Sequence, residues 1–435
     1  PPADDPYEVV AAAAALGPAL VAAPSVATAR RLGLRLRRAG EEVAVGGRDW
    51  ARSRAGVTTI GARAAAFAPI PEPAAVVVLD EHDERYQEER APTWHARDVL
   101  VERARRAGAP CLLVSPCPSL EALAAGPLVT PARAHERGGW PMLDVVDLRR
   151  EDPMRSRLLS ERLVDAVRSD ARVVCILNRT GRARLLACER CRELARCERC
   201  EAAVAQAAAG EQLHCGRCGL DRPVVCQACG ATTLRVVRSG VRRLRQDLEA
   251  LTGRPVAEVT AASPEGAPTR VTVGTEAALH HLDAADVVAF VEFDQELLAP
   301  RYRAAEEAMA LLALAARLVG GRRDGGRILV QTAMPEHDVV HAARLGDPGR
   351  LVEAERARRE LLRLPPAAPV AVVSGAAAEA FVAAIDVPLG VEVSGPSADG
   401  QWLVRAADHD QLADLLAATP RPAGRLRLSV DPVRL

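Results

Sequence analysis

Eight of the eleven cysteines in this chain fall into four C-x-x-C pairs, and their spacing points directly to metal chemistry. A gap of two residues lets both thiolates of a pair face one tetrahedral ion at about 2.3 Å. Eight thiolates satisfy two Zn²⁺ ions with no ligand left over, so we predict two structural zinc sites with closed coordination. In chain order the pairs are Cys188 and Cys191, Cys197 and Cys200, Cys215 and Cys218, and Cys226 and Cys229.

Other interpretations of the same cysteines predict different chemistry. A disulfide framework suits a small secreted domain, whereas the rest of this long chain is poor in cysteine. A thioredoxin-like redox site uses one C-x-x-C pair, not four within 42 residues. Spacing alone leaves open which pairs share an ion, and His214 beside Cys215 is a further candidate ligand. Glycines that suit tight metal-binding turns are Gly216, Gly219 and Gly230.

The composition excludes several kinds of chemistry. The chain has 57 basic and 57 acidic residues, and it contains no Lys, which removes Schiff-base chemistry and the Lys of a P-loop. No apolar run approaches the roughly 20 residues that span a bilayer, so we predict no membrane partner. At 435 residues the chain has room for about three domains. Because it opens with Pro1 and not Met, we expect a fragment or an early-truncated gene product.

The elements that must position these residues follow an alternating pattern. Short apolar strands separated by helices are typical of a parallel sheet covered on both faces. We therefore predict an α/β chain with two parallel-sheet lobes, a cysteine-rich insertion, a linker at 130–153 and a small α+β C-terminal domain. The main predicted strands are 19–23, 57–61, 75–79, 111–115, 173–177, 269–273, 287–291 and 327–331, and the main predicted helices are 302–318 and 352–362.

Several motifs resemble those of a known family. Residues 61–69 read G-A-R-A-A-A-F-A-P, residues 79–83 read L-D-E-H-D, and residues 94–99 read W-H-A-R-D-V. Residues 115–121 read S-P-C-P-S-L-E, and residues 177–181 read L-N-R-T-G just before the first cysteine pair. In this order the motifs resemble the PriA family of replication-restart proteins, which are DNA helicases of superfamily two. The resemblance begins just after the place of that family's P-loop and runs to the C-terminus.

This resemblance implies a nested pairing of the cysteines and two RecA-like lobes. One zinc ion would bind Cys188, Cys191, Cys226 and Cys229, and the other would bind Cys197, Cys200, Cys215 and Cys218. The implied domains are 1–129 for the first RecA-like lobe without its P-loop segment, 130–187 for a linker and the start of the second lobe, 188–232 for the two-zinc module, 233–335 for the rest of the second lobe, and 336–435 for the C-terminal domain.

The chain departs from the family at positions that carry ATP hydrolysis. The Asp that would hold Mg²⁺ is Leu79, which cannot ligate a hard cation. Asp80 and Glu81 come one and two positions too late, and a slip of one residue turns a strand side chain to the other face. His82 is interpreted as a remnant of the motif.

Two later motifs are altered as well. The family's Ala-Thr has become Pro116-Cys117, and an Arg of the last helicase motif has become Gly321. We therefore predict the degenerate branch of this family found in high-GC bacteria, without ATP turnover and without ATP and magnesium as working cofactors. The alternative is an active ATP-dependent 3′→5′ DNA helicase with atypical motifs.

DNA binding is predicted from charge and from aromatic residues. Positions 181–250 carry 13 Arg against 8 acidic residues, and such an excess supplies salt-dependent affinity for phosphates. Aromatic residues make up only 3% of the chain, and the resemblance implies a loop near residues 86–95 that senses single-stranded DNA. The candidate contacts are Tyr86, Trp94, His95, Arg97, Arg190 and Arg192, with Arg182, Arg184, Arg196 and Arg199 also near the first cysteine pairs.

The function that the resemblance implies is replication restart. A protein of this kind would bind abandoned or stalled forks, including their single-stranded parts, and would work with primosome components and the loader of the replicative helicase. It would act in the cytoplasm at the nucleoid.

Overall fold

The computed structural model describes residues 1–151, 158–178, 185–206, 212–236, 241–260, 269–397 and 399–435. The described residues divide into two compact units, Pro1–Asp4 with Val129–Ala354 and Asp5–Leu128 with Glu355–Leu435. The C-terminal residues therefore group with the first lobe, and the five domain boundaries expected from sequence stay predictions. Residues 179–181 of the L-N-R-T-G motif, and Arg182 and Arg184, lie outside the described residues.

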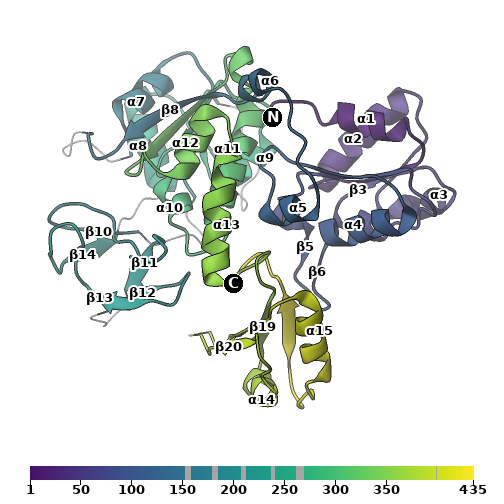
Figure 1. The fold of residues 1–435 in the computed structure, drawn as a ribbon. Coiled ribbons are helices and arrows are strands. Elements are labelled where there is room, and N and C mark those ends of the chain that lie inside the picture. The colour runs from purple at the N-terminus through teal and green to yellow at the C-terminus, as the bar shows by residue number, and fades with distance from the viewer. Residues whose placement is uncertain (152–157, 179–184, 207–211, 237–240, 261–268, 398) are drawn as a thin grey trace. The chain divides into compact units, whose positions relative to one another are not determined.

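Residues 5–128 form the first lobe, a parallel sheet with helices on both faces (Figure 1). Its elements are α1 (Tyr7–Ala14), β1 (Ala19–Ala22), α2 (Val26–Arg38), β2 (Val43–Val45), η1 (Gly47–Asp49), α3 (Trp50–Arg54), β3 (Thr58–Gly61), η2 (Arg63–Phe67), β4 (Ala75–Leu79), η3 (Glu84–Tyr86), β5 (Gln87–Glu88), β6 (Trp94–His95), α4 (Ala96–Ala107), β7 (Cys111–Val114) and α5 (Leu120–Ala125).

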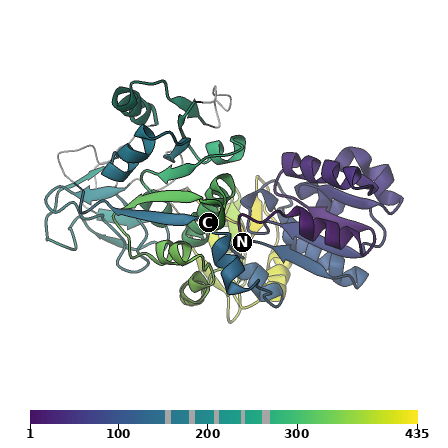
Figure 2. The ribbon, with the colours of Figure 1, turned by 90° about the horizontal axis from the view of Figure 1, so that it is seen from above.

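The strands of the first-lobe sheet follow the order β2-β3-β1-β4-β7. Because successive strand residues point to opposite faces, Val21 of β1 packs against α1 and α2, whereas Leu20 packs against α4. Figure 2 shows α1 and α2 in purple and α4 in blue on the two sides of this sheet. Burial on both faces explains why the strands read as continuous apolar runs.

The second lobe lies in residues 129–354 and is a six-stranded parallel sheet in the order β15-β16-β9-β17-β18-β8. Its elements are α6 (Arg133–Gly138), β8 (Met142–Asp147), α7 (Glu161–Arg168), β9 (Val173–Ile176), α8 (Val241–Thr252), β15 (Ala257–Val259), β16 (Val271–Gly274), α9 (Ala277–His281), β17 (Val287–Phe290), α10 (Asp294–Leu297), α11 (Ala304–Val319), η4 (Arg322–Asp324), β18 (Arg327–Thr332) and α12 (Asp338–Leu345).

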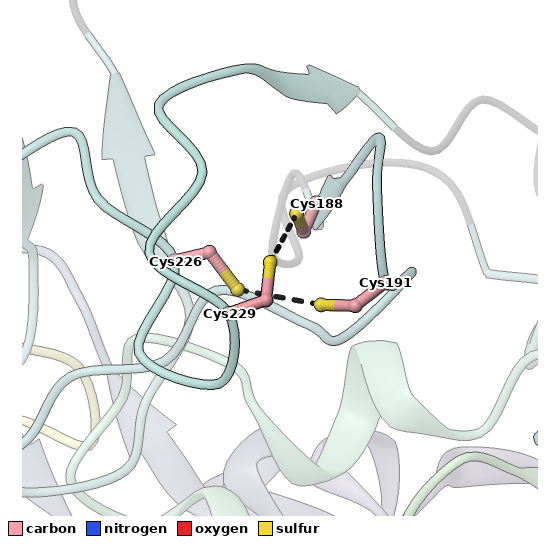
Figure 3. A group of neighbouring side chains, drawn as sticks. All are labelled: Cys188, Cys191, Cys226 and Cys229. Atoms are coloured by element: carbon pink, nitrogen blue, oxygen red, sulfur yellow. Dashed lines mark hydrogen bonds between the residues drawn. The ribbon is translucent and has the colours of Figure 1, made fainter.

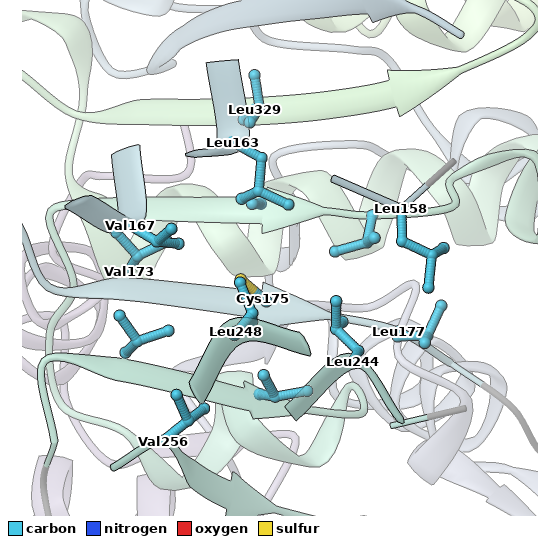
Figure 4. Close-up of a cluster of buried hydrophobic side chains, with 14 of the residues drawn as sticks. Leu158, Leu163, Val167, Val173, Cys175, Leu177, Leu244, Leu248, Val256 and Leu329 are labelled. Atoms are coloured by element: carbon cyan, nitrogen blue, oxygen red, sulfur yellow. The ribbon is translucent and has the colours of Figure 1, made fainter. Parts of the chain in front are cut away.

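The core of this lobe lies between its sheet and two helices. Leu163 of α7 and Leu244 and Leu248 of α8 are fully buried against Cys175 at the centre of β9 (Figure 4). Ser160 begins α7 by accepting a hydrogen bond from the N–H of Leu163 at 3.2 Å, which fixes where the helix starts. On the other face, α11 packs against β17 and β18.

The segment predicted as a linker contains regular structure. Within 130–153, β8 pairs in parallel with β18, from Met142 opposite Arg327 to Asp147 opposite Thr332. β8 is an edge strand with Met142 exposed and only Val146 buried. Its mixed polar sequence therefore lacks the continuous apolar run by which the buried strands were predicted.

The cysteine-rich insertion contributes two small antiparallel sheets to the same unit. One sheet pairs β10 (Leu186–Cys188) with β14 (Leu234–Val236), and the other joins β11 (Val204–Gln206), β12 (Gln212–Cys215) and β13 (Asp221–Pro223).

The C-terminal residues follow α13 (Arg350–Leu362) and form an antiparallel sheet in the order β20-β21-β19-β22. Its elements are β19 (Val370–Ser374), α14 (Ala378–Ala383), β20 (Glu392–Ser394), β21 (Trp402–Arg405), α15 (His409–Ala418) and β22 (Arg427–Val430). This is the small α+β domain predicted from sequence. Within the part of the chain that the structure describes, no helix combines the length and apolar character that a membrane crossing requires.

Candidate functional site

Four cysteine sulfurs meet in what we call the outer cluster, which consists of Cys188, Cys191, Cys226 and Cys229. All four sulfurs lie within 4.8 Å of one another. The Cys188 and Cys229 sulfurs are 3.6 Å apart, and those of Cys191 and Cys226 are 3.5 Å apart (Figure 3). A tetrahedral ion at about 2.3 Å from each sulfur spaces the sulfurs about 3.8 Å apart, whereas a disulfide needs about 2.05 Å. The spacing therefore fits the ligands of one shared ion.

The other four cysteines form the inner cluster, which consists of Cys197, Cys200, Cys215 and Cys218. The Cys197 and Cys218 sulfurs are 3.5 Å apart, as are those of Cys200 and Cys215. Both groupings match the nested arrangement that the family resemblance implied. His214 hydrogen-bonds Asp221 at 2.8 Å and is not a member of either cluster.

All four C-x-x-C pairs use the same backbone turn. The N–H of the first cysteine donates to the carbonyl five residues later, and its own carbonyl accepts from the N–H four residues later, at 2.8 or 2.9 Å. The residue after the second cysteine therefore takes a left-handed backbone, with φ of 73° at Gly219 and Gly230, 65° at Arg192 and 59° at Glu201. Glycine at this position therefore indicates only two of the four turns, those that end at Gly219 and Gly230.

Backbone groups also prepare the sulfurs for a metal. The N–H of Cys191, together with that of Arg190, outweighs burial and lowers the pKa of the Cys188 thiol to about 6. In the inner cluster, the N–H of Arg199 donates to the Cys197 sulfur at 3.4 Å. Such N–H donors stabilise thiolates, which are the form that binds zinc. The four cysteine sulfurs of each cluster therefore fit a structural Zn²⁺ ion, with backbone donors at Cys188 and Cys197.

The inner cluster is attached to the second lobe by the loop between α10 and α11. The N–H of Ala203 donates to the carbonyl of Leu298 at 2.8 Å. The Arg217 guanidinium donates to the carbonyls of Cys200 at 3.1 Å and Ala299 at 2.7 Å. Leu298 is 1% exposed and packs with apolar residues of the insertion. No local sequence pattern could indicate this attachment, because Arg217 and Ala299 are 82 positions apart.

The position expected to hold magnesium is filled by a buried apolar side chain. Leu79 ends β4 and is 2% exposed, and its carbonyl accepts a 2.6 Å hydrogen bond from the Tyr86 hydroxyl. Tyr86 is itself fully buried, and burial raises its pKa well above the ordinary value. Asp80 follows Leu79 with a left-handed backbone at φ 51°.

The carboxylate of Glu81 is buried and already bonded. Arg97 of α4 donates to it at 3.2 Å, and the hydroxyl and backbone N–H of Ser119 donate at 2.8 Å each. Glu81 is fully buried and Arg97 is 5% exposed. Their opposite charges and hydrogen bonds offset the free-energy cost of removing both charged groups from water. This network joins β4, α4 and the start of α5, and it engages both oxygens of the carboxylate.

Gly321, which the resemblance leads us to expect at an altered motif, has no room for a larger side chain. A Cβ at Gly321 would lie 2.3 Å from the carbonyl oxygen of Gly138, closer than any side chain allows. The neighbouring guanidinium of Arg322 faces the carbonyls of Trp140 and Pro141 at 3.4 Å, and Arg323 pairs with Asp4 at 2.9 Å. Arg322 and Arg323 are therefore engaged within the second-lobe unit.

The six candidate DNA contacts fall into different environments. Tyr86 and Arg97 are buried and hold the first lobe together, as described above. His95 caps α4 through an N–H from Arg97 at 3.3 Å. Trp94 is partly exposed and packs edge-on against Phe67, with ring centroids 4.7 Å apart. Phe67 is 53% exposed and was not singled out from the sequence, although it lies in the 61–69 motif.

On the outer cluster, Arg190 and Arg192 are exposed. Other arginines of the basic segment have structural roles, since Arg222 is 9% exposed and donates to the carbonyls of Arg196 and Val225 at 3.0 and 2.8 Å. Charge counting alone did not separate these two kinds of arginine. The role of Arg190 and Arg192 as DNA contacts stays a prediction.

Two parallel-sheet lobes, a module with two four-cysteine clusters and a small antiparallel C-terminal domain define a multidomain α/β protein with a cysteine-rich insertion that could hold two metal ions. No family model matches the chain. It is 33% identical over 342 residues to the "Probable replication restart protein PriA" of Mycobacterium leprae, covering 73% of this chain and 52% of that protein. It is 30% identical over 378 residues to the "Replication restart protein PriA" of Treponema pallidum, covering 78% and 57%.

A third relative, the "Replication restart protein PriA" of Bacillus subtilis, is 26% identical over 355 residues, covering 75% of this chain and 44% of that protein. The chain therefore belongs to the family of PriA replication restart proteins. It spans about half the length of the curated relatives it matches.

Proposed function

We propose that this chain binds abandoned or stalled replication forks and promotes primosome assembly and reloading of the replicative helicase, without ATP-driven unwinding. The names of its relatives support the restart role. The observation that carries the proposal is that both four-cysteine clusters are complete, whereas Leu79, where the resemblance leads us to expect the magnesium ligand, is a buried apolar side chain. Its partners would be forked and single-stranded DNA, primosome components and the helicase loader, in the cytoplasm at the nucleoid.

We propose two zinc ions per chain as the cofactors. The outer cluster would hold one ion and the inner cluster the other, each through four thiolates. A closed set of four protein ligands leaves no position for water, so each ion would stabilise the fold and take no part in a reaction. The inner ion would also fix the turn that Arg217 connects to the second lobe.

Leu79 and Glu81 do not fit the ligands of a magnesium nucleotide. Mg²⁺ needs oxygen ligands in octahedral geometry. Leu79 supplies none, and the oxygens of Glu81 already accept hydrogen bonds from Arg97 and Ser119. Gly321 has no space for a side chain that could stabilise the transferred phosphoryl group. These features support a scaffold and not a motor.

The proposed contact with DNA includes Arg190 and Arg192, and the salt dependence of fork binding tests it. Binding of the zinc-loaded chain to a labelled fork would be followed by fluorescence anisotropy over a range of salt concentrations. Replacing both residues with Ala should weaken binding and lower the slope of log K against log salt by about 2, since each lost phosphate contact removes about 0.9.

A matched control replaces Arg168 and Arg344 with Ala, because both are exposed arginines of the second lobe. This control should leave the slope near the wild-type value. Two results would show that the outer cluster does not contact DNA. One is an unchanged slope in the double variant of Arg190 and Arg192, and the other is an equal fall of the slope in the control.

A further inference from the structure

The two cysteine clusters differ in how easily a solute in water can reach them. In the outer cluster Cys191 is exposed and Cys229 is partly exposed, and the other two cysteines are buried. In the inner cluster three cysteines are buried and Cys218 is partly exposed. A small molecule in solution therefore has readier access to the outer cluster, and above all to Cys191.

The inner cluster is enclosed by apolar side chains and by the second lobe. Its three buried cysteines share one core with apolar residues of the insertion, namely Leu186, Ala195, Ala202, Val204 and Leu213. Among the residues that the structure describes, the outer cysteines do not belong to that core. Pro300 of the second lobe covers the inner turn, because a Cβ at Gly216 would lie 3.2 Å from the Cβ of Pro300. The bonds of Arg217 to the carbonyls of Cys200 and Ala299 close the same side.

The local sequence is the same in the two clusters. Residues 188–191 and 197–200 both read C-E-R-C, so Cys191 and Cys200 are corresponding cysteines with the same charged neighbours inside the pair. Cys191 is exposed, whereas Cys200 is 5% exposed. The two positions therefore differ in access and not in local sequence.

The reactive form of sulfur is common to both clusters if each binds zinc, and here the inference rests on the proposed function. A cysteine that binds zinc does so as a thiolate, and the thiolate is the form that oxidants attack. With thiolates in both clusters, the rate of oxidation depends on which sulfur an oxidant can reach.

We propose that Cys191 is a modification site, which hydrogen peroxide oxidises before any cysteine of the inner cluster. The Cys191 sulfur attacks one peroxide oxygen, the O–O bond breaks, and a sulfenic acid and a hydroxide ion form. The thiolate of Cys226, whose sulfur is 3.5 Å away, then displaces a second hydroxide and forms a disulfide. The two sulfurs lose two electrons and the peroxide gains them, and both hydroxide ions take up protons from the solvent. The outer cluster then lacks two of its four thiolates and no longer closes a tetrahedral site.

The three cysteines outside the clusters provide internal standards for ordinary thiols. Burial raises the pKa of Cys111 to about 11 and that of Cys175 to about 12, so both are protonated at neutral pH. Cys117 is 8% exposed. All three should react with peroxide more slowly than Cys191.

The experiment uses the full purified chain, whose zinc content is first measured by elemental analysis. Dilute hydrogen peroxide is added at pH 7 with the chelating dye 4-(2-pyridylazo)resorcinol, which reports released zinc, and a sample without peroxide gives the background. We expect one zinc ion to be released at least about ten-fold faster than the other. Mass spectrometry of peptides with blocked thiols should find the first disulfide between Cys191 and Cys226, while Cys200 stays reduced.

A variant tests whether enclosure protects the inner cluster. Arg217→Ala removes the bonds that close its side against the second lobe. It should speed release of the slower ion about five-fold and leave the faster release unchanged. The matched control is Arg199→Ala, which changes an exposed arginine of the inner cluster and should leave both rates unchanged.

Release of both ions at one rate, or oxidation of Cys200 before Cys191, would overturn the proposal. An unchanged slower rate in folded Arg217→Ala would also contradict it. These results differ from a failure of the proposed function, which would appear before any peroxide is added. A chain purified without zinc would contradict the proposed cofactors and, with them, this inference.

Discussion

At the scale of single residues, the partners of a side chain decide what it can do. Glu81 keeps the carboxylate that an ATPase would use, but Arg97 and Ser119 already engage both of its oxygens. Gly321 lies so close to Gly138 that no larger residue fits the backbone as it stands. The packing around Glu81 and Gly321 therefore supports the proposed loss of ATP hydrolysis, and we predict that restoring one family residue alone would not restore a nucleotide site.

The left-handed turns of the inner cluster predict how a substitution at the turn residue changes zinc affinity. A Cβ at Gly219 would meet no atom within 4 Å, so Gly219→Ala should cost only backbone strain of about 1 kcal/mol. Because metal binding and local folding are coupled, zinc affinity of the inner cluster should fall about five-fold. Competition with a chelator measures the affinity.

Glu201→Gly is the matched variant, because Glu201 takes the same turn position with φ of 59° and an exposed side chain. Glu201→Gly should raise the zinc affinity, but by a smaller factor than Gly219→Ala lowers it. The gain is smaller because glycine also increases the conformational entropy of the unfolded chain. Equal affinities in both variants would contradict the role of backbone strain in these turns.

At the scale of elements, the cysteine pairs act as local folding units. The prediction is that Cys197→Ser lowers the zinc content of the purified chain from about two ions to about one, because a three-thiolate site no longer closes its tetrahedron. Protection of β11 and β12 from hydrogen exchange should be lost as well. Elemental analysis measures the zinc content.

The control for this prediction is Cys111→Ser, which changes a cysteine outside both clusters. It should keep both ions. Two ions bound to Cys197→Ser, with exchange protection retained, would show that Cys197 is not a ligand.

The elements that sequence could predict are those set by local pattern. Buried strands such as β1, β4 and β17 read as apolar runs, and the C-x-x-C spacing indicates a knuckle within four residues. The edge strand β8 was missed because only Val146 of its residues is buried, so it lacks an apolar run. The contact of Arg97 with Glu81 and that of Arg217 with Ala299 depend on chain segments brought together by folding, so no local pattern could indicate them.

At the scale of the whole molecule, the two parallel sheets and the cysteine-rich insertion are the architecture that the family resemblance implied. The change of the nucleotide positions is part of the proposed function. A fold can keep its surfaces for binding after its chemistry is lost, because packing depends on the apolar faces of its strands and not on the polar residues at their ends. The cysteine clusters are consistent with this, since their ligands are complete.

The most direct test of the account is ATP hydrolysis by the zinc-loaded chain, measured with and without a DNA fork that it binds. Working enzymes usually turn over at about 1 s⁻¹ or faster. We predict fork binding with hydrolysis no faster than the protein-free background in both conditions. Fork-stimulated turnover near 1 s⁻¹ would contradict the scaffold proposal and would favour an active helicase with atypical motifs.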